Sequence, residues 1–228
     1  MTVSSAMDEQ QPVTSSTYVS HVAATLWENL PHLLWGALIF SLACAPVFVL
    51  FSFGLLAAGL LAMAVVVGPV WAALQAYSLR MAGGYACTTG TFFTAFRQHW
   101  RGGALLGLLA LFPWMALLTT LPLLQQNPIP FVVWLGLSAD FLGIAVMLAL
   151  SLYTFPLLIQ RGISVRAAVR DALILTSRYP SNTLGLLALG ILFGFAAVYL
   201  SLGLLFILPA VYSLFIATNS LLVLSQEA

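Results

Sequence analysis

Long uncharged runs alternate with short polar segments along most of the chain. No Asp, Glu, Lys or Arg occurs in residues 33–78 or in residues 181–226. A helix needs about 20 apolar residues to cross a bilayer, so each of these runs is long enough for two crossings. Residues 103–124 and 131–155 each predict one more crossing. The pattern therefore predicts an all-α, polytopic transmembrane helix bundle with six spans.

The two long runs must each contain a turn. In the first run, the spans are expected at residues 33–51 and 54–77, with a kink at Gly68-Pro69 because proline removes a helical hydrogen bond. The second run is expected to turn near residues 201–203. Without that turn, five spans and a re-entrant segment remain as the alternative.

The basic residues are all arginines, and they occupy two of the connections between spans. Arg80, Arg97 and Arg101 follow the second span, and Arg161, Arg166, Arg170 and Arg178 follow the fourth. Short loops rich in arginine stay on the cytoplasmic side of a membrane. We therefore expect a multi-pass protein of a bacterial cytoplasmic (inner) membrane with both termini in the cytoplasm.

Outside the spans, the domain organisation is expected to be simple. Residues 1–20 are rich in Ser, Thr and Gln and predict a disordered cytoplasmic tail, whereas residues 21–228 predict a single transmembrane domain. The pentapeptide Gly-Leu-Leu-Ala-Leu at 107–111 recurs at 185–189, each time after a basic segment. This recurrence indicates a parallel internal repeat with halves 21–125 and 126–228. Chance similarity between apolar segments is an equally good explanation.

Both basic connections have the periodicity of amphipathic helices. In the first, Arg97 and Arg101 are displaced from an aromatic stripe that includes Trp100. In the second, Arg166 and Arg170 lie one turn apart. Its apolar face is expected to hold Val165, Val169, Ala172 and Leu173. Each segment predicts a helix in the cytoplasmic membrane surface, where arginines contact anionic headgroups or a membrane-protein partner. The alternative is that both helices only anchor the bundle.

Composition narrows the classes of function. With 62% hydrophobic and 6% charged residues, the chain lacks the roughly 25% charge that a soluble domain carries. Its net charge of +1 is too small for binding nucleic acid through many phosphates. The sequence contains no phosphate-binding glycine loop, nucleophile elbow or metalloprotease helix, and its three histidines are far apart. We therefore predict no metal site, no cofactor and no enzymatic activity.

One carboxylate falls well inside a predicted span. Asp140 lies about nine residues from the start of the fourth span. A charge in hydrocarbon costs at least about 2.5 kcal/mol, so such a residue is a functional candidate. The residues that could hydrogen-bond to it, from the same or other spans, are Ser138, Thr119, Thr120 and Asn219. A small secondary transporter would use Asp140 as its proton, cation or substrate site, and the alternative is a structural hydrogen bond between helices.

The order of several motifs resembles the YesL-like family of bacterial integral membrane proteins. These motifs are Asn29 with Pro31, the segment Gly68-Pro69-Val70-Trp71-Ala72-Ala73-Leu74, the segment Phe92-Phe93-Thr94-Ala95-Phe96-Arg97-Gln98-His99-Trp100-Arg101, and Phe155-Pro156-Leu157-Leu158. The resemblance covers most of the chain from Trp27 onward. The family has no established biochemical function, and its genes often neighbour carbohydrate ABC-transport genes. The resemblance therefore implies an accessory role in sugar uptake, with an ABC transporter component as partner.

These features lead to one functional hypothesis and one alternative. The hypothesis is a non-enzymatic membrane protein, an accessory or interaction subunit that binds through its arginine-bearing surface helices. The alternative is the small secondary transporter with Asp140 at its site.

Overall fold

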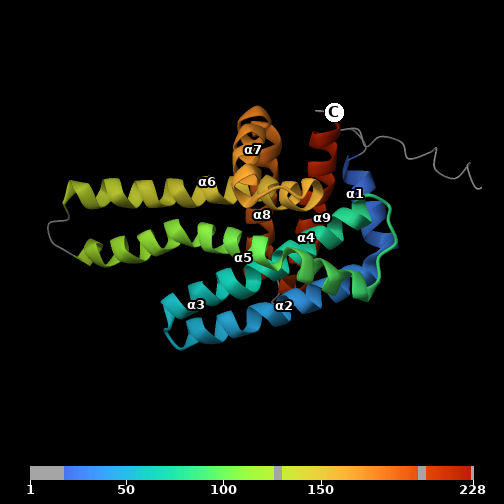
Figure 1. Ribbon diagram of the computed structural model, residues 1–228. Helices are drawn as coiled ribbons and strands as arrows, with labels where there is room; N and C mark the ends of the chain where they lie inside the picture. The colour runs from blue at the N-terminus through green and yellow to red at the C-terminus, as the bar shows by residue number, and fades with distance from the viewer. Residues whose placement is uncertain (1–17, 126–129, 200–203, 227–228) are drawn as a thin grey trace, which may run out of the picture.

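The computed structural model describes residues 18–125, 130–199 and 204–226, and every regular element within these ranges is a helix (Figure 1). In chain order the elements are α1 (Tyr18–Glu28), α2 (Leu30–Ser52), α3 (Leu56–Ala62), η2 (Met63–Val67), α4 (Gly68–Ala82), α5 (Thr89–Thr120), η3 (Leu121–Gln125), α6 (Phe131–Arg161), α7 (Val165–Arg178), α8 (Pro180–Tyr199) and α9 (Leu204–Ser225). The segment η2 is a π-helix and η3 is a 3₁₀ helix. The all-α prediction is therefore confirmed.

Several helical segments of the described chain are long and apolar enough to cross a membrane. Five of them meet this condition alone: Leu30–Ser52, Leu56–Ala82, Thr89–Gln125, Phe131–Arg161 and Phe206–Ser225. The pair α7 and α8, whose axes meet at 100°, brings the number to six if it counts as one broken span. The prediction of a transmembrane helix bundle is confirmed, and the described residues offer five to six candidate spans, which does not decide between the predicted six and the alternative of five with a re-entrant segment.

Two sequence predictions fall wholly or partly outside the described residues. The turn expected at 201–203 is one of them. The other is the tail predicted for residues 1–20, of which only 18–20 are described, and these already belong to α1.

The second span changes its helical geometry where a kink was expected. Pro69 has no N–H group to donate, and it occupies the first turn of α4, where helices tolerate proline. Directly before it, η2 forms a π-helical segment, and the N–H of Gly68 donates to the carbonyl of Met63, five residues back. This π-helical segment packs against α5, where the carbonyl of Ala64 lies beside Gly107.

The two basic connections adopt different structures. The first is continuous with the third span: α5 runs unbroken from Thr89 to Thr120 instead of starting with a separate surface helix. Thr88 and Thr91 form a capping box at its start. The second is a helix of its own, α7, which Ser164 caps by accepting a hydrogen bond from the N–H of Ala167 at 3.4 Å. Of the two basic connections, only the second therefore forms a helix, α7, whose axis is separate from that of the preceding span.

Helix α4 occupies the centre of the bundle. All of its residues except Trp71 and Arg80 are buried, among them Tyr77 and Leu74 with no exposed surface. Helices α2, α5 and α9 pack around it, and Figure 1 shows α9 passing across its length. Trp71 contacts Phe40 of α2 and Tyr212 of α9, with ring centroids 5.5 and 6.4 Å away. Through Trp71, the short helix α4 thus packs against both α2 and α9.

Helix α5 approaches α4 and η2 at backbone distance because glycines line the contact. A Cβ atom added at Gly68 would lie 2.7 Å from the carbonyl oxygen of Gly103, and one added at Gly107 would lie 2.5 Å from that of Ala64. Real Cβ atoms do not come that close to backbone atoms. Gly103 and Gly107 have the GxxxG spacing that lets membrane helices pack closely. Any larger residue at these positions must separate the helices.

The repeated pentapeptide offers a matched pair of substitutions. Its first glycine, Gly107, meets the backbone of Ala64, whereas the equivalent Gly185 has no atom within 4 Å of an added Cβ. We expect Gly107→Ala to lower the free energy of unfolding by about 1–3 kcal/mol, the usual cost of overpacking. Gly185→Ala should leave it unchanged or raise it by about 0.5–1 kcal/mol, because alanine favours helix. Thermal unfolding of the purified variants in detergent measures both effects, and equal shifts would contradict the packing described above.

Candidate functional site

Asp140 lies on α6, which packs antiparallel to α5 (Figure 1). Gly143 is packed against Pro113 and Gly136 faces Thr120, which places Asp140 near the level of Ala116. Its side chain is partly buried, and Oδ2 is shielded from solvent without a hydrogen-bond partner in the described chain. A buried carboxylate oxygen without a hydrogen bond is energetically costly.

The polar partners expected for Asp140 are engaged elsewhere. The hydroxyls of Thr119 and Thr120 both donate to the carbonyl of Ala116, and that of Ser138 donates to its own helix. Asn219 lies on α9, where it lines a cavity together with residues of α1 and α8. The structure therefore does not bring Asp140 and Asn219 into one site, and the expected hydrogen bond is absent from the described residues.

A different set of buried polar groups lies where α4 and α9 cross. Ser213 donates to Ser78 at 2.8 Å, and neither residue is exposed. Gln75, one turn before Ser78, is fully buried, and both atoms of its amide lack a partner in the described chain. Sequence reasoning missed this cluster. Its signal was the spacing of Gln75 and Ser78 on one face of an otherwise apolar helix.

The arginines of the first basic segment extend from α5. Arg101 lies over the ring of Trp100, with Cζ 5.4 Å from the ring centroid, and Trp100 is itself 46% exposed. Arg97 is exposed one turn earlier. A guanidinium over an indole is weakly attracted to the ring. The pair therefore forms a surface with both cationic and aromatic character.

The second basic segment forms the most amphipathic helix of the described chain. Ala168, Ala172 and Leu175 of α7 are buried, so the inner face differs from the predicted one, in which Leu173 was placed. Leu173 is 56% exposed and shares the outer face with Arg166, Arg170 and Ile174. The reason is geometric, because adjacent residues are 100° apart and only Ala172 can face inward with Ala168.

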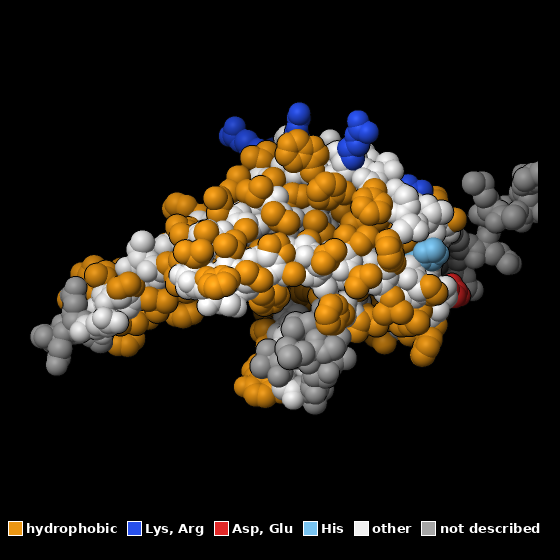
Figure 2. Space-filling model, turned by 90° about the horizontal axis from the view of Figure 1, so that it is seen from below, with side chains coloured by type: hydrophobic (Ala, Val, Ile, Leu, Met, Phe, Trp, Pro, Cys, Tyr) orange, Lys and Arg blue, Asp and Glu red, His pale blue; other side chains and the backbone are white. Residues whose placement is uncertain are grey.

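One acidic residue, Asp171, pairs with two of the arginines around α7. The carboxylate of Asp171 accepts from Arg161 at 3.4 Å and from Arg170 at 3.3 Å. The Arg170 side chain keeps 77% of its surface exposed, so this pair contributes little to stability. Arg166 makes no ion pair within the described residues. The arginines visible in Figure 2 stand along one edge of a largely apolar surface. The outer face of α7 is thus cationic at its start and aliphatic near its middle.

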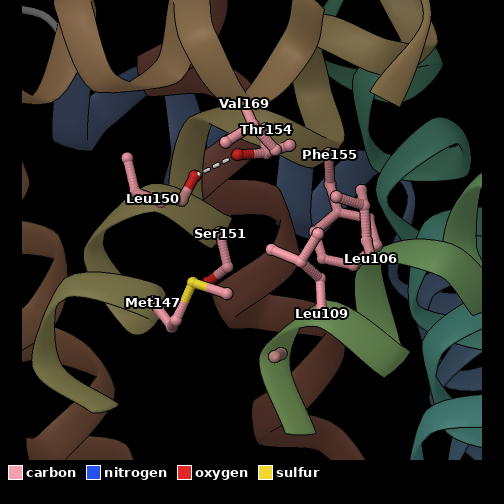
Figure 3. A pocket seen from close by; sticks show the side chains of 9 residues that line it. Leu106, Leu109, Met147, Leu150, Ser151, Thr154, Phe155 and Val169 are labelled. Atoms are coloured by element: carbon pink, nitrogen blue, oxygen red, sulfur yellow. Dashed lines mark hydrogen bonds between the residues drawn. The ribbon is translucent and has the colours of Figure 1, made fainter. Parts of the chain in front are cut away.

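Two cavities lie beside α7 and the start of α8. The smaller, about 30 Å³, lies between α5, α6 and α7 and is almost wholly apolar. Figure 3 shows the hydroxyl of Thr154 turned to the carbonyl of Leu150, at 2.7 Å, so it offers no free donor. The larger, about 500 Å³, lies between the start of α8, the end of α9 and Tyr18 of α1. Only the larger one has both the volume and the polar groups of a binding site.

The described residues contain no group of three His, Cys, Asp or Glu side chains that could hold a metal ion. Comparison of the chain with known protein families, curated proteins and solved structures finds no match. The comparisons therefore give the YesL-like resemblance no support, and it stays a prediction.

Proposed function

We propose that this chain is a non-enzymatic integral membrane protein that acts as an accessory or interaction subunit through its arginine-bearing helices. The observation that carries the proposal is the outer face of α7, which presents Arg166 and Arg170 beside Leu173 and Ile174. A helix with these two kinds of side chain fits the boundary between headgroups and acyl chains. Its axis turns by 100° into α8, which leaves the outer face open to a neighbour.

The energetics favour a protein partner in addition to lipid. Each arginine near an anionic headgroup contributes about 1 kcal/mol, so two arginines orient α7 but do not by themselves make a specific site. The aliphatic pair Leu173 and Ile174 adds apolar area that a partner helix can cover. The YesL-like resemblance extends the proposal to a component of carbohydrate ABC-type uptake as that partner.

Photo-crosslinking tests this contact. A photoreactive residue in place of Ile174 should link to one discrete membrane protein in cells, whereas the same residue in place of Leu192, exposed on α8, should link to lipid. Changing Arg166 and Arg170 together to Glu should lower the protein crosslink by at least about fivefold, because two contacts of about 1 kcal/mol are lost.

Mass spectrometry of the linked product identifies the partner. A transport component would support the carbohydrate-uptake extension. The same products at both positions, or a yield that the charge reversal leaves unchanged, would contradict a contact through α7.

The proposal requires α7 to lie on the cytoplasmic side. In a chain whose Cys44 and Cys87 are replaced by Ser, we expect Ser52→Cys to react with a membrane-impermeant maleimide added to intact cells. Ser177→Cys of α7 should react only after permeabilisation, because arginine-rich segments stay in the cytoplasm. Both serines are exposed, so accessibility within the protein does not separate them. Labelling of Ser177→Cys in intact cells would contradict the predicted topology and place α7 on the outer side.

The transporter alternative is supported by one observation, the buried and unpartnered Oδ2 of Asp140. A relay needs a second charged group in the span, and α6 has none near Asp140. We therefore expect proteoliposomes of the wild-type chain to show no solute-driven pH change. A pH change that Asp140→Asn abolishes and Ser138→Ala preserves would establish the transporter instead. Ser138 is a suitable control because its hydroxyl donates within its own helix.

A further inference from the structure

The cavity between α1, α8 and α9 is not used by the proposed function. It encloses about 500 Å³, which suits a ligand of lipid-headgroup or drug size. Its lining divides into two kinds of surface. The polar residues are Tyr18, Tyr179, Ser181, Asn182, Asn219 and Gln226. The apolar residues are Leu186, Leu189, Phe215 and Leu222. A site of this kind fits an amphipathic ligand.

The polar half contains groups that lack partners. Asn219 is only 7% exposed, lines the cavity, and has no hydrogen-bond partner for Nδ2 in the described chain. Helix α8 begins at the cavity. In its first turn Pro180 has no N–H and the N–H of Thr183 donates to the carbonyl of Tyr179 at 3.1 Å, which leaves the N–H groups of the two residues between them without an acceptor in the helix. Ser181 and Asn182 belong to that turn. Together these donors fit a phosphate group.

The charge of the lining restricts the ligand further. Among the described residues, no charged side chain lines the cavity. The positive end of the α8 dipole and the negative end of the α9 dipole both border it, since α8 starts and α9 ends there. The rings of Tyr18, Tyr179 and Phe215 can also attract a cation. A ligand with one negative and one positive group, and no net charge, matches this arrangement.

Tyr18 fixes one wall of the cavity. Its hydroxyl donates to the carbonyl of Phe215 at 2.9 Å, and its ring meets that of Phe215 edge to face. Burial raises the pKa of the Tyr18 phenol, so it stays a neutral donor. Gly185 also lines the cavity, and an added Cβ there meets no atom within 4 Å. The space beside Gly185 is therefore open to a ligand.

We propose that this cavity binds one zwitterionic phospholipid, with the phosphate at the start of α8 and the ammonium group against the aromatic rings and the end of α9. On the predicted topology, the start of α8 lies directly after the surface helix α7, at the depth of the cytoplasmic headgroups. The acyl chains leave along the apolar half of the lining. The site is separate from the arginines of α7.

Native mass spectrometry of the delipidated protein, with defined lipids added back, tests the proposal. We expect one molecule of phosphatidylethanolamine to bind more tightly than phosphatidylglycerol, which is anionic, or diacylglycerol, which has no phosphate. Gly185→Leu fills the open space and should weaken this binding at least about tenfold, a loss of about 1.4 kcal/mol. The control Gly194→Leu, on the same helix and also without a neighbour within 4 Å, should bind like the wild type.

Asn219→Leu provides a second variant with a side chain of similar size and no amide. It should weaken phosphatidylethanolamine binding without affecting diacylglycerol, and it carries the test alone if Gly185→Leu does not fold. Equal or tighter binding of phosphatidylglycerol would overturn the zwitterionic assignment. Unchanged binding by Gly185→Leu, with a folded protein, would overturn the cavity as the site.

Discussion

The backbone contact between α5 and the η2–α4 segment is the constraint on which the rest of the packing depends. Lipid tails are as apolar as leucine, so membrane helices gain little from hydrophobic burial and associate through close packing. Gly68, Gly103 and Gly107 bring two backbones together at distances that no side chain would allow. At such distances, Cα–H groups can also approach carbonyl oxygens such as that of Ala64. The π-turn before Pro69 fits this contact, because it places the Ala64 carbonyl against α5.

The same contact explains why polar groups are buried beside α4. With α5 close on one side, α4 is enclosed, and α9 crosses it on another. The hydroxyl pair Ser78 and Ser213 fixes the register of that crossing, because each would otherwise be an unsatisfied group in an apolar surrounding. Gln75 adds two further buried polar atoms at the same helix. The centre of the protein is thus specified by a few polar and glycine positions within a largely unspecific apolar bundle.

The sequence predicted the helical class, the range of five to six spans and the position of the irregularity at Gly68-Pro69, because these follow from run length and proline chemistry. It also predicted that α7 is amphipathic, but it placed Leu173 on the wrong face. In a short helix, the sequence pattern alone does not decide which of two adjacent residues, such as Ala172 and Leu173, faces inward. It missed the glycine contact and the Ser78–Ser213 pair. Both depend on which helices are neighbours, and hydropathy along the chain contains no information on that. For the same reason, the sequence analysis expected Asp140 and Asn219 to form one site, whereas the fold separates them.

The distribution of charge separates two kinds of membrane contact in one small protein. Six of the seven arginines stand on α5 and around α7, the seventh, Arg80, stands at the end of α4, and Asp171 offsets part of the charge around α7. Among the described residues, the lining of the cavity between α1, α8 and α9 contains no charged side chain, and helix ends and amide groups border it instead. Charges placed inside it would have to be desolvated, whereas helix dipoles are already fixed by the fold. The arginine-bearing surface and the cavity therefore differ in their source of electrostatic attraction, which is charged side chains in the first and helix ends in the second.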